Sequence, residues 1–201
     1  MIQYETQETR HGGQARWIRF GTANGLLGGV LLAVLGLVIH TGLTDAQFEV
    51  ANPLGAVAMV LLVAALPVFY LHERHWFGRL ATAGFWLTTA GWVATAVTMA
   101  LFALGSEMAG LVFVPAWLVA MLGAFALGVA MLRSDDVSST RLSAWLFVAA
   151  LPVGLALSVA VTWFAFGRVD TPWNGPLVLY ALAWVVFCAR AWSGPTDTVR
   201  G

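Results

Sequence analysis

The chain has 201 residues, of which 60% are hydrophobic and only 10% are charged, with a formal net charge of zero and a mean hydropathy of +0.81. A soluble domain carries about 25% charged residues, so this composition excludes an ordinary soluble protein. Every cationic residue other than histidine is an arginine, which excludes chemistry that depends on a lysine Schiff base.

Six uncharged runs account for most of the chain. They cover residues 20–44, 50–71, 80–106, 108–132, 142–167 and 171–189. Each run is close to the ~20 residues that a helix needs to cross the hydrocarbon core of a bilayer. The connections are short and leave no room for a second domain. The sequence therefore predicts an all-α, polytopic integral membrane protein with six transmembrane helices.

The first run, at residues 20–44, is longer than the apolar region of a cleaved export signal and follows a polar segment that contains Glu5 and Glu8. We expect it to remain as the first helix. The preceding segment has too little apolar surface to fold alone, which predicts disorder. The expected organisation is a disordered cytoplasmic tail at 1–18, a six-helix transmembrane domain at 19–192 and a cytoplasmic tail at 193–201.

The distribution of arginine predicts that both termini face the cytoplasm. With that orientation the cytoplasmic segments contain Arg10, Arg16, Arg19, Arg74, Arg79, Arg133, Arg141, Arg190 and Arg200, and the outer segments contain only Arg168. Cytoplasmic loops of membrane proteins carry an excess of arginine and lysine. We therefore expect a multi-pass protein of the cytoplasmic membrane.

The stretch HERH at residues 72–75 holds two of the four histidines and most resembles a chemical site. A zinc-protease helix needs H-E-x-x-H, with the histidines four residues apart, whereas these are three apart. Zinc also needs a third ligand and usually a fourth, and none lies at a recognisable spacing. We interpret HERH as a solvated interfacial loop that anchors helix ends, with a weak metal or pH-sensing role as the alternative. No catalytic, metal-binding or cofactor-binding residue is predicted.

No aspartate, glutamate, lysine or arginine lies within any of the six runs. Ionisable residues inside the membrane are typical of proton relays, ion paths and catalysis. Their absence from the runs predicts a non-enzymatic protein, although it does not exclude a carrier of neutral or apolar molecules.

Small residues recur at helical spacing, which indicates faces where helices pack closely. The predicted packing residues are Gly21, Gly25 and Gly29 in the first run, Gly84 and Gly91 in the third, and Gly154 in the fifth. Such faces can also bind a second copy of the chain or another membrane protein. We expect the lipid bilayer as a partner and no nucleic acid.

Several polar and aromatic residues are far from the predicted membrane interfaces. They are Thr88, Trp92 and Thr95 in the third run, Trp117 in the fourth and Trp184 in the sixth. We favour core packing for them, because pockets are few per protein. The alternative is that they line a pocket or a polar path for a solute.

The segment LLVAALPV at 61–68 nearly recurs as LFVAALPV at 146–153. Because the two halves of the chain would cross the membrane in opposite directions, a true duplication would be a 3+3 inverted repeat, as in many secondary transporters. Apolar sequence of low complexity also produces such matches. The expected function is a structural, accessory or sensing component of the membrane, and the alternative is a carrier or channel for a small neutral or apolar solute.

Overall fold

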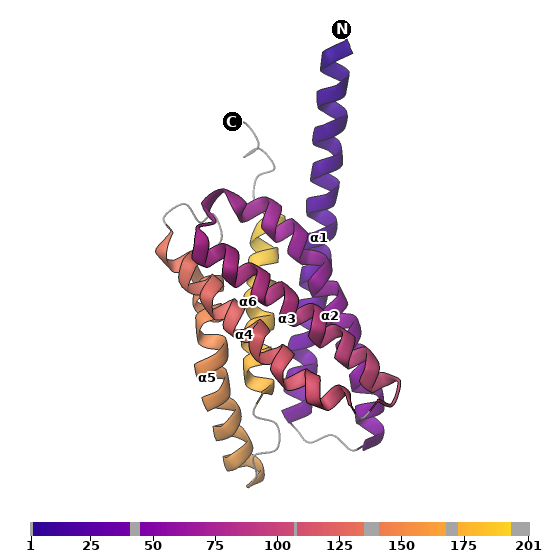
Figure 1. The fold of residues 1–201 in the computed structure, drawn as a ribbon, viewed down its shortest axis with the longest axis vertical. Helices are drawn as coiled ribbons and strands as arrows, with labels where there is room; N and C mark the ends of the chain where they lie inside the picture. Colours follow the sequence, from indigo (N-terminus) through magenta and orange to yellow (C-terminus); the bar gives the residue numbers. More distant parts are fainter. Residues whose placement is uncertain (1, 41–44, 107, 135–140, 168–172, 194–201) are drawn as a thin grey trace.

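The computed structural model contains six long α-helices and one short 3-10 helix, shown in Figure 1. In chain order these are α1 (Ile2–His40), α2 (Asp45–Glu73), η1 (Arg74–Trp76), α3 (Arg79–Ala103), α4 (Ala109–Arg133), α5 (Arg141–Phe166) and α6 (Asn174–Ser193). The structure describes residues 2–40, 45–106, 108–134, 141–167 and 173–193, and of these the side chains of 2–15, 40, 45–48 and 166 are not described.

Each of the six α-helices provides a segment that is long and apolar enough to cross a membrane, and the segment of α2 continues through η1. These segments are Arg16–Ile39, Glu49–Trp76, Arg79–Ala103, Ala109–Arg133, Arg141–Ala165 and Asn174–Ser193. They correspond one to one with the six predicted runs, which confirms the all-α architecture and the number of long apolar helices. The arrangement fits a multi-pass membrane protein.

The first helix begins at Ile2 and therefore includes the residues for which the sequence predicts a disordered tail. In Figure 1 this part of α1 projects beyond the bundle. Extending a helix that is already nucleated avoids the cost of a new nucleus, so the apolar part of α1 can support helix in the polar residues before it. The disorder of residues 1–18 and the division of the chain at 19 and 193 remain predictions.

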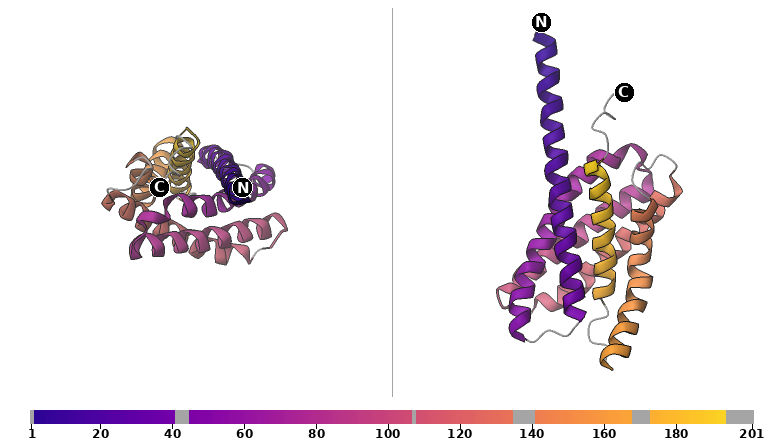
Figure 2. Two further views of the ribbon diagram at one scale, coloured as in Figure 1. Left: turned by 90° about the horizontal axis from the view of Figure 1, so that it is seen from above. Right: turned by 180° about the vertical axis from the view of Figure 1, so that it is seen from behind.

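The helices form a ring that follows the order of the chain. Each helix packs against its neighbours in sequence, and α6 closes the ring against α1. The most extensive contact joins α3 and α4. Figure 2 shows that α1 begins and α6 ends on the same side of the bundle.

Glycine allows the backbones of α3 and α4 to touch. A Cβ atom on Gly84 would lie 2.7 Å from the backbone nitrogen of Leu127, and one on Gly91 would collide with the backbone of Ala120. A Cβ atom on Gly123 of α4 would likewise collide with the backbone of Thr88. Backbone atoms cannot rotate away as a side chain can, so this helix pair needs residues without a side chain at these positions.

The other predicted glycines lie at further helix contacts. In α1, Gly21 faces Val68 of α2, Gly25 faces Cys188 of α6, and Gly29 faces α6, where an added Cβ would lie 2.9 Å from a methyl group of Val185. In α5, a Cβ on Gly154 would lie 2.5 Å from the backbone nitrogen of Pro176 in α6. Small residues thus occupy the contacts that close the ring.

Candidate functional site

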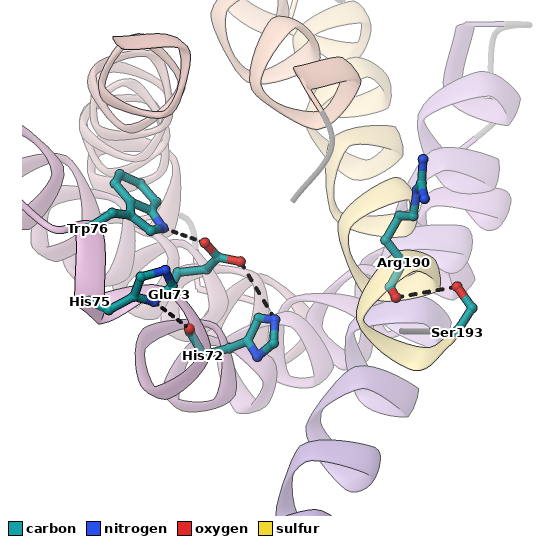
Figure 3. A network of polar contacts seen from close by, with 6 residues as sticks. All are labelled: His72, Glu73, His75, Trp76, Arg190 and Ser193. Carbon is teal, nitrogen blue, oxygen red and sulfur yellow. Dashed lines mark hydrogen bonds and ion pairs between the residues drawn. The ribbon is translucent and has the colours of Figure 1, made fainter. Parts of the chain in front are cut away.

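A fully buried carboxylate lies at the end of α2. Glu73 has an exposed fraction of 0%, and one of its oxygens, Oε2, accepts a hydrogen bond from the indole N–H of Trp76. The other oxygen, Oε1, lies 3.8 Å from Nε2 of His72. Figure 3 shows the carboxylate between the imidazole and the indole. We call His72, Glu73 and Trp76 the Glu73 site.

The local chain path brings these side chains together. The helix α2 ends at Glu73 and passes directly into the 3-10 turn η1, which ends as the N–H of Phe77 donates to the carbonyl of Arg74 at 3.2 Å. Glu73 and Trp76 are three residues apart, which places them on the same side of this turn. The ring of Phe77 packs edge-on to Trp76 at 4.7 Å and to Tyr70 at 5.7 Å, so the carboxylate lies beside an aromatic cluster.

The interpretation of HERH as a solvated loop is wrong for Glu73. His72 and Glu73 belong to α2, and Glu73 is buried, whereas Arg74 and His75 are exposed. The predicted second run stops at Leu71, because the charged side chain of Glu73 is expected to contact water. A carboxylate can be buried when hydrogen-bond donors replace its water, and the Trp76 indole is one such donor.

A neighbouring carboxylate and imidazole can share a proton or provide two ligands to a metal ion. Within the described parts of the chain, however, no three side chains of His, Cys, Asp or Glu lie close enough together to hold a metal. Structural and catalytic zinc sites take three or four protein ligands. The hydrogen bond from Trp76 and the position at the junction between α2 and α3 make the Glu73 site a tether for that turn.

The second polar feature lies in the centre of the bundle. The indole of Trp92 in α3 packs against the ring of Tyr180 in α6 at 4.6 Å, and Trp184 lies one turn further along α6, 6.3 Å from Tyr180. Phe147 of α5 contacts both Tyr180 and Trp184, at 5.5 and 5.9 Å. We call these four residues the aromatic core. Each is almost completely buried.

All five residues predicted as alternative pocket lining are buried. Trp92 and Trp184 meet at Tyr180, whereas Trp117 lies in α4 and makes no ring contact among those found in the described part of the chain. Thr88 lies against Gly123 of α4. The hydroxyl of Thr95 donates a hydrogen bond to the carbonyl of Gly91 within its own helix, at 2.7 Å. Its proton is therefore not available to a solute in a polar path.

Several buried polar atoms in the described part of the chain have no hydrogen-bond partner. They are Thr88 Oγ1, the indole nitrogens of Trp92, Trp117 and Trp184, Tyr180 Oη and Asn174 Nδ2. Sequence reasoning missed Tyr180 and Asn174 as well as Glu73. Tyr180 precedes Trp184 by four residues, which places both on one helix face, and that spacing was the available signal.

Compared with protein-family models, curated proteins and solved structures, the chain matches none. The described part of the chain is all-helical, and its six helices of spanning length fit a multi-pass membrane protein. Because a fold alone does not imply a function, the residues of this chain carry the functional evidence.

Proposed function

We propose that the protein is a non-enzymatic component of the cytoplasmic membrane with a structural, accessory or sensing role. The supporting observation is the close packing of the interior. The backbones of α3 and α4 touch at Gly84 and Gly91, and the centre of the bundle is filled by large buried side chains such as Trp92 and Trp184. A bundle packed in this way presents its lipid-facing and end surfaces, rather than an internal cavity, to other molecules.

We further propose that both termini are cytoplasmic. The arginines whose side chains are described lie at one end of the bundle. They are near the start of the spanning segments of α1, α3 and α5, and near the ends of α2, α4 and α6. They are Arg16, Arg19, Arg74, Arg79, Arg133, Arg141 and Arg190. The positive-inside rule assigns this end to the cytoplasm. The side chains of Arg10, Arg168 and Arg200 lie outside the described part.

Cysteine labelling in intact cells tests this orientation. In a Cys188→Ala background, an impermeant maleimide should modify Glu49→Cys from outside, and should modify Ser193→Cys only after the membrane is permeabilised. Both positions are exposed in the structure, at opposite ends of the bundle. The reverse pattern would contradict the orientation, and labelling of both positions in intact cells would contradict the odd number of crossings between them.

A carrier or channel for a small neutral solute is the second candidate. It is favoured by the buried polar atoms without partners, because Trp92, Tyr180 and Trp184 place three hydrogen-bonding groups near the middle of α3 and α6. An unpaired buried donor costs about 1–3 kcal/mol, which a bound polar solute could recover. The reactivity of a cysteine at position 88 toward a small thiol reagent distinguishes the two functions, because a carrier predicts rapid reaction and a packed bundle predicts none.

A further inference from the structure

The cationic end of α1 carries an exposed hollow lined by one arginine and two aromatic residues. Arg16, Trp17 and Phe20 border an open hollow of about 240 Å³. The rings of Trp17 and Phe20 pack edge to face at 6.2 Å, yet 68% and 60% of these residues remain exposed. Arg19, three residues after Arg16, is exposed on the same part of the helix. We call Arg16, Trp17, Arg19 and Phe20 the α1 surface site.

An apolar stripe continues from this site along α1. Starting from Phe20, the helix exposes Leu27, Val30, Val34 and Leu37, with intervals of seven, three, four and three residues that keep them on one face. The stripe from Phe20 to Leu37 spans about 25 Å at 1.5 Å per residue, most of the ~30 Å hydrocarbon thickness. The face therefore combines a cationic, aromatic head with a long apolar body.

The charges around the site favour an anion. Of the acidic side chains that the structure describes, Glu49 lies at the opposite end of the bundle and Glu73 is buried. No described carboxylate is therefore exposed at this end, where Arg16 and Arg19 are both exposed. A guanidinium group matches the geometry of a phosphate and can bind it through two parallel hydrogen bonds.

We propose that the α1 surface site binds the headgroup of an anionic phospholipid, whose acyl chain lies along the stripe below Phe20. The hollow is smaller than the ~300–1,000 Å³ of pockets that enclose a drug-sized ligand, which suits one headgroup at a membrane interface. Tryptophan at the depth of the headgroups is typical of membrane proteins, and Trp17 supplies it here. A ligand with an anionic head and an apolar tail fits both parts of this face.

Native mass spectrometry of the full chain in detergent tests the proposal. The protein is titrated with phosphatidylglycerol or with phosphatidylcholine of the same acyl chains, and separately with inorganic phosphate. The test variant is Arg16→Gln with Arg19→Gln. The control is Arg74→Gln with Arg133→Gln, which removes the same charge from two other exposed arginines at the same end. A thermal melt of each variant in the same detergent establishes that it is folded.

Wild-type protein should retain phosphatidylglycerol in preference to phosphatidylcholine, and the test variant should lose affinity for it by roughly five-fold per arginine, whereas the control should lose much less. Trp17→Ala should weaken retention of both lipids, since it removes apolar contact rather than charge. Equal retention of the two lipids by wild type, or equal losses in test and control variants, would overturn the proposal. Displacement of the lipid by millimolar inorganic phosphate would also overturn it, because the site would then recognise free phosphate.

Discussion

At the scale of single residues, Glu73 is the side chain whose placement needs the most explanation. A charged group is expensive to bury unless hydrogen-bond donors replace its water. The Trp76 indole donates to one carboxylate oxygen and the His72 imidazole lies near the other. These contacts are formed within five consecutive residues, so they fix the direction in which the chain leaves α2 and enters α3.

Substitutions of Glu73 test this role. Glu73→Ala should lower the free energy of unfolding by about 1–3 kcal/mol, because the partly buried N–H of Trp76 loses its acceptor. Glu73→Gln keeps an acceptor oxygen and should cost less. Thermal unfolding in detergent measures the difference, with Glu49→Ala on an exposed carboxylate as the control. If Glu73→Ala and Glu49→Ala melt alike, the carboxylate does not tether the turn.

Sequence reasoning could place HERH at a helix end but not bury its glutamate. The second predicted run stops at Leu71, because a rule based on charge assigns every carboxylate to water. The indole of Trp76 replaces that water. A hydropathy scale scores residues one at a time and does not include hydrogen bonds between particular side chains. Trp76 and Phe77 follow Glu73 in the sequence, and these aromatic residues indicate that the apolar environment continues beyond Glu73.

At the scale of helices, the contact of α3 with α4 depends on positions without a side chain. Glycine spacing in the third run predicted a packing face, and the structure places Gly84 and Gly91 directly against α4. The spacing could not identify the partner helix, because several runs carry small residues at intervals of four. In the structure, a Cβ atom added to Gly84 or Gly91 would collide with backbone atoms of α4, which identifies α4 as the partner helix.

Gly91→Ala should destabilise the protein by about 1–3 kcal/mol, because the new methyl group meets the backbone of Ala120 and must push α3 away from α4. Gly110→Ala is the matched control. It also adds one methyl group to a helix, but the nearest atom, at the tip of the Phe102 ring, is 3.8 Å away. The control should be neutral or slightly stabilising, since alanine favours helix over glycine. Equal denaturation midpoints for both variants would contradict close packing at Gly91.

At the scale of the whole molecule, the number of helices and their order in the ring follow from different physical constraints. The number follows from the length of apolar runs, which the hydrocarbon thickness determines. Neighbours in sequence pack together because the connections are short. The closure of α6 on α1 depends on Gly25 and Gly29 meeting α6, which run lengths do not encode. The inverted repeat between the two halves remains a prediction.

The closed interior is the central claim, and Thr88 is the best position to test it. Thr88 is buried between α3 and α4, and its hydroxyl has no partner among the described residues. In the packed bundle it has no contact with water. In a carrier, the same face of α3, which includes Trp92, would line a hydrated path. Cysteine is close in size to threonine and reacts as the thiolate, which requires an aqueous environment.

The most direct measurement is therefore the modification of Thr88→Cys, in a Cys188→Ala background, by methyl methanethiosulfonate in reconstituted vesicles, followed by intact-mass analysis. The exposed Ser193→Cys should react within minutes, and Thr88→Cys should react only after the protein is unfolded in sodium dodecyl sulfate. This pattern is expected for a packed bundle without an internal path. Rapid modification of Thr88→Cys in a variant that still melts like its parent would contradict the closed interior and favour a carrier or channel.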